Sequence, residues 1–188
     1  MKLWKIFGCL PIVFFIFGCK EKENNAFKFS LNGSETVVSL VKIENNVFDI
    51  KAVTHLAGGE NIVSVRRLNY PVYRFECADI TGDGIPEIAV GVIKPNHLDP
   101  KPDKRLFLFK LYDGMYIRPL WLGSKLPYPL VDFRLPKTDA GYVIRTIEQS
   151  SQDKFNVTDY RIKSFGPATL KSIKKGAGRQ EAQILLSD

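Results

Sequence analysis

The chain has 188 residues, a formal charge of +7 at neutral pH and three cysteines. From residue 19 onward it is long enough for one domain that buries an apolar core without disulfides. Because Cys9 and Cys19 belong to the apolar N-terminus, Cys77 alone remains in the domain, which excludes an intramolecular disulfide there.

The N-terminus is typical of an export signal. Lys2 and Lys5 precede an apolar run, Ile6–Gly18, that ends at Cys19. A basic start, an apolar stretch of this length and a small residue before the break predict a secretory signal over residues 1–18. The run is shorter than the about 20 residues that a membrane-spanning helix needs. An uncleaved transmembrane anchor is the alternative.

The four residues Ile16-Phe17-Gly18-Cys19 resemble a bacterial lipobox, the motif whose cysteine is acylated before the signal is cut. Phe17 departs from the usual small residue. The resemblance implies a lipid-anchored protein of the cell envelope, held at the outer membrane through Cys19 and facing the periplasm or the cell surface. Residues 19–26 are mostly polar and would form a tether between the lipid and the domain.

Apolar and polar residues then alternate, which is the pattern of a half-buried strand. Alternation begins in Phe27–Leu31, resumes in Thr36–Ile43 and returns in Val47–Val53, after a hairpin-type turn at Asn45-Asn46. These segments predict antiparallel strands at the start of the domain.

The same pattern continues along the chain. Arg105–Tyr112 and Met115–Leu122 flank the strong hairpin signal Asp113-Gly114, and Tyr142–Ile147 and Thr158–Lys163 follow later. The one helix expected is short, near Glu181–Leu186. We therefore predict an all-β domain over residues 27–172.

A weak internal repeat suggests how these strands are grouped. Strand–turn–strand units recur around Asn45-Asn46, Asp113-Gly114 and Phe165-Gly166. They predict about three blade-like antiparallel sheets in a propeller-like arrangement. Closed propellers have at least about four blades. The domain is therefore expected to be open or incomplete, a modified closed form, or half of an assembly.

One stretch, CADITGDGIPEIAVGV from Cys77 to Val92, has the oxygen spacing of a calcium loop. Gly84 permits the sharp turn, and Ca²⁺ takes several oxygens at about 2.3–2.6 Å. The spacing predicts one structural Ca²⁺, and the alternative is a turn that uses Asp and Gly for their backbone preferences alone. The expected ligands are Asp79, Thr81, Asp83, the carbonyl of Ile85 and Glu87.

This stretch resembles the FG-GAP or VCBS repeat of integrin-α-type β-propellers, over roughly one blade, Tyr73 to Leu122. In that repeat an Asp-x-Asn-x-Asp-Gly-x-x-Asp loop precedes a strand that ends in Val-Gly, here Val90-Gly91. Thr81 and Glu87 depart from the pattern. The resemblance implies a propeller blade with calcium bound in its loop, and it implies no catalytic activity.

Familiar catalytic motifs are missing from the chain. It contains no HExxH, no G-x-S-x-G and no P-loop, and its two histidines are not at zinc-ligand spacing. We therefore predict a non-catalytic binding or scaffold protein; the alternative is an envelope hydrolase with a site assembled from scattered loop residues. An envelope protein or polysaccharide is the expected partner. A candidate recognition face, which could equally be packing residues, comprises Tyr116, Arg118, Trp121 and Arg134.

The C-terminus is expected to be a basic and polar tail over residues 173–188. Several of its charges gather in Lys171–Arg179, which predicts a solvated segment. Nucleic acid is not an expected partner, because an exported protein rarely meets it.

Overall fold

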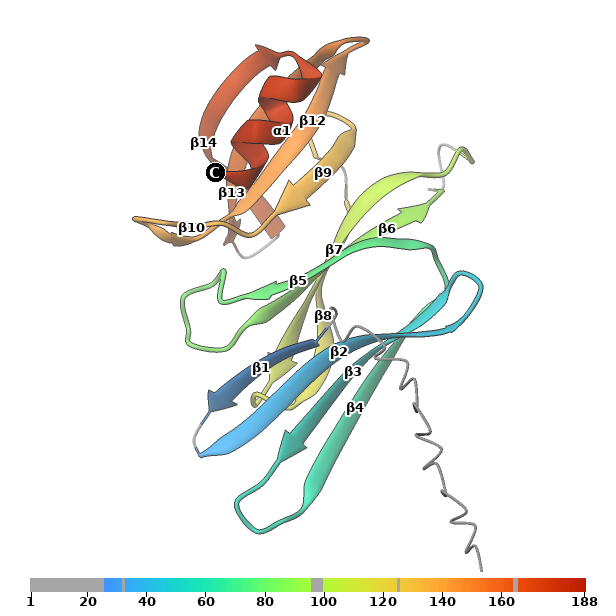
Figure 1. Ribbon diagram of the computed structural model, residues 1–188, viewed down its shortest axis with the longest axis vertical. Helices are drawn as coiled ribbons and strands as arrows, with labels where there is room; N and C mark the ends of the chain where they lie inside the picture. Colours follow the sequence, from blue (N-terminus) through green and yellow to red (C-terminus); the bar gives the residue numbers. More distant parts are fainter. Residues whose placement is uncertain (1–25, 32, 96–99, 125, 164–165) are drawn as a thin grey trace, which may run out of the picture.

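The computed structural model describes residues 26–31, 33–95, 100–124, 126–163 and 166–188. Within these residues three four-stranded antiparallel sheets follow one another along the chain, together with a two-stranded hairpin and one helix. No sheet closes on itself, and the sheets lie one above another in Figure 1. The prediction of an all-β, open, propeller-like domain is confirmed.

Sheet 1 is a meander of β1 (Ala26–Leu31), β2 (Ser34–Glu44), β3 (Val47–His55) and β4 (Asn61–Leu68). Asn46 turns the chain between β2 and β3 with a positive φ of 60°, a conformation that asparagine tolerates better than most residues. Alternate side chains of β2 and β3 are buried, as the period-2 pattern predicts.

Sheet 2 contains β5 (Val72–Ala78), β6 (Glu87–Lys94), β7 (Asp103–Tyr112) and β8 (Tyr116–Leu122). Its strand β6 is buried from Glu87 to Val92 on both faces, because this sheet lies between the other two. Asp113 and Gly114 both have positive φ in the tight turn of residues 113–115, across which Tyr112 pairs with Tyr116.

Sheet 3 contains β9 (Leu130–Arg134), β12 (Ile144–Ser151), β13 (Lys154–Lys163) and β14 (Gly166–Ala177). The short hairpin of β10 (Lys137–Thr138) and β11 (Gly141–Tyr142) interrupts it after β9. The helix α1 (Arg179–Ser187) closes the described chain. In Figure 1 this helix lies against sheet 3.

The buried apolar residues form three clusters, one at each junction of this stack. Val38, Ile50 and Leu68 of sheet 1 pack against Ile88 and Phe109 of sheet 2. A second cluster joins sheet 2 to sheet 3, and a third lies between sheet 3 and α1. Each sheet therefore gains its stability from the layer next to it. Within the described residues, no helix has the length and apolar character needed to cross a membrane.

Two expectations from the sequence are corrected by the fold. The turn at Asn45-Asn46 joins the second and third strands of its sheet, whereas Asp113-Gly114 joins the third and fourth, so the two are not equivalent. Phe165 lies outside the described residues. The segment 173–188 is not a solvated tail, because it forms the end of β14 and then α1, whose Ala182 and Leu186 are buried. Its charges lie on the exposed sides of these elements.

Candidate functional site

The loop between β5 and β6 is held closed by its own carboxylates. Oδ1 of Asp79 accepts hydrogen bonds from the backbone N–H groups of Gly82 (2.7 Å) and Asp83 (3.1 Å). Oδ2 of Asp79 accepts one from Gly84 (2.8 Å). Gly82 and Gly84 adopt φ of 76° and 83°, which turns these N–H groups toward a single acceptor. Asp79 thus acts as the centre of the turn.

Glu87 joins the other end of the loop to the sheet. It is the first residue of β6 and none of its surface is exposed. Its carboxylate accepts hydrogen bonds from the backbone N–H groups of Ile80 (3.0 Å) and Thr81 (3.1 Å), and from the Thr81 hydroxyl (2.9 Å). Burial raises the pKa of Glu87, and the Thr81 hydrogen bond opposes this.

A lysine from the neighbouring strand completes the loop. Lys110 of β7 is the direct cross-strand partner of Glu87, and its Nζ lies 3.6 Å from Glu87 Oε1. The same ammonium donates a hydrogen bond to Oδ2 of Asp83. This bond lowers the pKa of Asp83 and raises that of Lys110. The loop therefore has a cation of its own between two of its acids.

These contacts bear on the predicted calcium ligands. The structure brings Asp79, Thr81, Asp83, Ile85 and Glu87 into one loop, as expected. The carboxylates of Asp79, Asp83 and Glu87 meet N–H donors and the Lys110 ammonium, however. In the described residues no group of three or more acidic, histidine or cysteine side chains is arranged to hold a metal. Ca²⁺ needs converging oxygens, so binding it would require these carboxylates to leave the N–H donors and the Lys110 ammonium. Calcium binding stays a prediction.

The second feature is a groove of about 610 Å³ to which all three sheets contribute. The first strand of each sheet, β1, β5 and β9, supplies part of its wall, and the end of α1 supplies another part. The rings of Phe27 and Phe75 meet within it, with centroids 5.7 Å apart. In a propeller-like arrangement, the first strands of the blades surround the axis. The lining residues are Phe27, Phe75, Glu76, Cys77, Arg134, Leu135, Pro136, Leu186 and Ser187.

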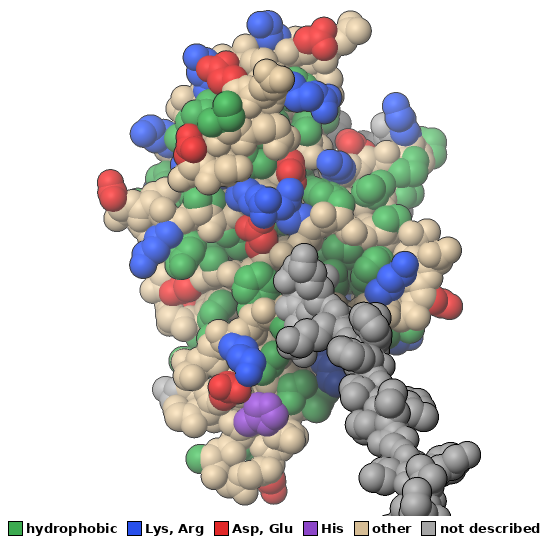
Figure 2. Space-filling view, in the orientation of Figure 1, with side chains coloured by type: hydrophobic (Ala, Val, Ile, Leu, Met, Phe, Trp, Pro, Cys, Tyr) green, Lys and Arg blue, Asp and Glu red, His purple; other side chains and the backbone are tan. Residues whose placement is uncertain are grey.

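Glu76 and Arg134 at this groove, with Arg74 and Asp132 next to them, form an ion-pair network between sheets 2 and 3. Glu76 accepts hydrogen bonds from Arg134 (2.8 Å) and from the backbone N–H of Leu135 (2.8 Å). Arg74 makes a bidentate pair with Asp132, at 2.7 and 2.6 Å, and its other nitrogen lies 3.6 Å from Glu76. Burial opposes the charge of Arg74, but the bond to Asp132 raises its pKa overall. Figure 2 shows basic and acidic side chains together where the upper sheet meets the middle one.

Cys77 lies at the same groove as a free thiol. Burial raises its pKa, so the thiol stays protonated and is a poor nucleophile. Its partly buried side chain packs against the cluster between sheets 1 and 2. Cys77 is therefore a packing residue, as its apolar neighbours suggest.

The four predicted recognition residues do not gather on one surface. Arg134 lines the groove, whereas Tyr116 and Arg118 are exposed near the start of β8, the outer strand of sheet 2. Trp121 packs beside Gly166, where any Cβ would come 2.6 Å from its ring. It lines a separate hollow of about 400 Å³ between sheets 2 and 3. Of the four, Arg134 alone belongs to the groove.

Sequence reasoning missed the residues that organise both sites. Lys110 could have been found from the sequence. Pairing the buried residues of β6 with those of β7 in an antiparallel hairpin places Lys110 opposite Glu87. Arg74, Glu76 and Asp132 carried none, since the contacts between β5 and β9 join residues 58 positions apart. The lipidation candidate Cys19 lies outside the described residues.

Comparisons with protein-family profiles, with curated proteins and with solved structures gave no match to this chain. The likeness of the loop to an FG-GAP or VCBS repeat therefore rests on its own residues. Gly91 of the Val-Gly pair has a local reason here, because a Cβ at this position would come 2.5 Å from the Tyr73 ring.

Proposed function

We propose that this chain is a lipid-anchored binding or scaffold protein of the bacterial cell envelope, and that it is not an enzyme. The observation that carries the proposal is the groove formed by β1, β5, β9 and α1. Its walls combine apolar side chains with a rigid ion-pair network. Ligand sites in proteins commonly combine apolar walls with a few oriented polar groups.

The charged groups of the groove favour binding over catalysis. A general acid or base must be free to exchange a proton with its substrate. Glu76 instead is held by Arg134 and the Leu135 N–H, and Asp132 is held by two nitrogens of Arg74. Carboxylates engaged in this way orient their partners. The hydrolase alternative would need one of them to be released.

The exposed part of Arg134 indicates which partner the groove suits. Its side chain is 46% exposed, and its hydrogen bond to Glu76 uses one of the five guanidinium donors. Beside it lie Phe75, Leu135 and Leu186, which offer apolar contact. We expect a protein segment of the envelope with an apolar side chain next to a carboxylate. A polysaccharide, the other partner class, would need more unpaired donors and acceptors along the walls.

The expected anchor would hold this groove near the membrane. Cys19 precedes Ala26, where β1 begins, by seven residues, and a fully extended chain of that length spans at most about 25 Å. Phe27 in the groove follows directly. A partner in the same membrane, or close to it, is therefore within reach.

Photo-crosslinking in cells tests the proposal. A benzophenone amino acid at Phe75 should give a discrete crosslinked product, and the same probe at Leu170, exposed on β14, should not. Arg134→Ala should weaken the Phe75 product. The proposal fails if the Phe75 probe gives no more crosslinking than the Leu170 probe. It also fails if the purified protein hydrolyses peptide, ester or glycoside substrates and loses this activity in Glu76→Gln or Asp132→Asn.

A further inference from the structure

The stack of sheets has two ends, and the described residues cover only one of them. At the C-terminal end α1 lies on the outer face of sheet 3, where Ala182 and Leu186 pack against Ile147, Phe155 and Val157. At the N-terminal end one face of sheet 1 packs on sheet 2. No other described element covers the opposite face, which we call the outer face of sheet 1.

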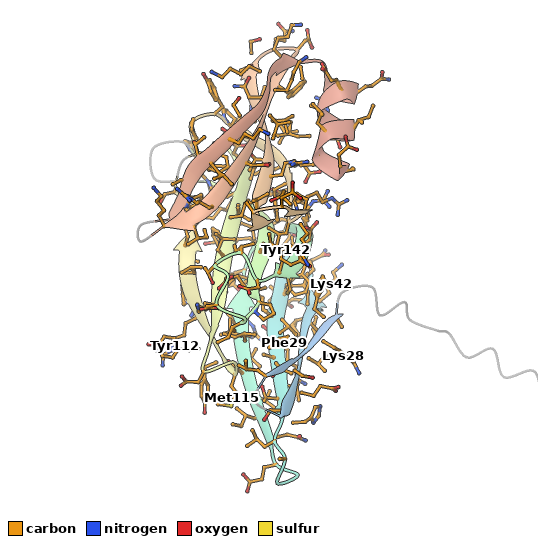
Figure 3. All side chains as sticks on the ribbon, turned by 90° about the vertical axis from the view of Figure 1, so that its left-hand side faces the viewer. Lys28, Phe29, Lys42, Tyr112, Met115 and Tyr142 are labelled. Atoms are coloured by element: carbon orange, nitrogen blue, oxygen red, sulfur yellow. The ribbon has the colours of Figure 1, made fainter. Side chains whose placement is uncertain are left out.

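The strand register identifies the residues of this face. Val38 and Ala52 point inward and are buried, so their neighbours along β2 and β3 point outward. Figure 3 shows the same alternation on β1, where Phe29 points into the stack and Lys28 points away from it.

The outer face carries a row of β-branched residues. Val37, Val53 and Val63 lie side by side across β2, β3 and β4. Val65 and Val41 follow in the next two rows. Val63 is 53% exposed and Val65 is 52% exposed. A contiguous apolar row of this kind, in the middle of a sheet face, is what the chain buries at its two other sheet junctions.

The charges on this face are compatible with a second copy of itself. Arg67 makes a bidentate pair with Asp49 at 2.8 and 2.9 Å, and Lys28 lies 3.9 Å from Glu35. Both pairs are neutral overall, so two identical faces would not repel through them. Lys51 lies beside Val65 in the next row, and a lysine stem is long enough to pack on apolar surface while its ammonium stays in solvent.

We propose that the outer face of sheet 1 binds the same face of a second copy of this chain, around a two-fold axis. A two-fold interface needs only one self-complementary patch. Stacked arrays need covered or polar ends to remain soluble. Two chains joined at their open ends make a continuous stack of six sheets with α1 at each end. This pairing continues the face-to-face stacking that already joins sheets 1, 2 and 3.

The area of the outer face sets the expected affinity of the dimer. Four strands about 4.8 Å apart, with about eight residues each at about 3.3 Å, offer roughly 500 Å² per copy. The total of roughly 1,000 Å² is near the lower limit for specific interfaces. The dimer is therefore expected to dissociate in the micromolar range. Chains anchored on one membrane would meet at a higher effective concentration.

Sedimentation equilibrium tests the proposal on the chain from residue 19, which contains every described element, with Cys19→Ser to prevent lipid-driven association. Between about 1 and 200 µM the mass should rise from monomer toward dimer. Val63→Lys should shift the dissociation constant at least tenfold toward monomer. The matched control is Ile184→Lys, which changes an apolar residue that is 64% exposed on α1 and should leave the dissociation constant unchanged.

Thermal unfolding of each variant separates loss of the interface from loss of the fold. Val63→Lys should melt, at a concentration where wild type is monomeric, within about 2 °C of wild type, because its side chain is exposed. The proposal is overturned if wild type is a monomer throughout the concentration range. It is also overturned if Val63→Lys, still folded, dimerises as strongly as wild type.

Discussion

Replacing Lys110 by methionine should destabilise the protein by leaving the acids of the β5–β6 loop without a cation. The Lys110 ammonium lies 3.6 Å from Glu87, which is completely buried, and also bonds Asp83. Methionine keeps most of the apolar stem. The substitution therefore tests the charge with little change in packing.

The magnitude follows from the exposure of the two acids. A buried hydrogen-bonding group that loses a partner costs about 1–3 kcal/mol, and Glu87 keeps its hydrogen bonds to Ile80 and Thr81, so this range applies to it. Asp83 is 42% exposed in its side chain, so losing its ion pair adds at most about 1 kcal/mol. A loss of about 2 kcal/mol corresponds to a fall in Tm of about 4–8 °C for a domain of this size.

Circular dichroism melts in a chelating buffer measure this loss. Lys171→Met is the matched control, an exposed lysine on β14 whose loss should shift Tm by less than about 2 °C. In a Glu87→Gln background the effect of Lys110→Met should shrink, because the buried charge is gone. If Lys110→Met melts like wild type, or if its effect is the same in both backgrounds, the ammonium does not compensate Glu87.

Three further predictions concern the anchor, the loop and the helix. Labelled fatty acid should enter wild type and not Cys19→Ser; equal labelling would disprove the anchor. Millimolar Ca²⁺ should raise Tm. At a hundredfold excess over Kd, binding adds up to about 2.7 kcal/mol to the free energy of unfolding. Lys110→Met should enlarge this rise in Tm, and Asp83→Ala should abolish it. Identical Tm values with calcium and with chelator would mean that the loop is only a turn and binds no Ca²⁺. Asp159→Asn should cost about 3–5 kcal/mol by unpairing buried Arg145, which also bonds the Leu185 carbonyl of α1. Faster amide exchange in α1 would accompany that loss, and unchanged exchange would contradict it.

The sequence by itself determined the type of local structure. Alternation in segments such as Thr36–Ile43 and Arg105–Tyr112 predicts strands, because side chains in a strand point to opposite faces at every step. Asp113-Gly114 predicts a tight hairpin, because both residues accept positive φ. The acids of residues 79–87 were recognisable as one loop, since they are close along the chain.

The position of each turn within its sheet was not readable in the same way. Asn45-Asn46 and Asp113-Gly114 have similar local signals, yet they follow the second and third strands of their sheets respectively. A turn depends on two or three residues, whereas the number of strands before it depends on where pairing begins. The expectation of a tail after residue 172 failed similarly, because Leu186 gains its burial from β12 and β13, which lie earlier in the chain.

Only the tertiary structure decided what the polar residues do. Lys110 supplies a cation to the loop because β6 and β7 pair in one register. Arg74 meets Asp132, and Arg134 meets Glu76, because sheets 2 and 3 pack with β5 beside β9. The groove and the outer face of sheet 1 likewise depend on which faces the stack covers. Local periodicity reports which way a side chain points; what it meets there is settled by stacking between segments far apart in the chain.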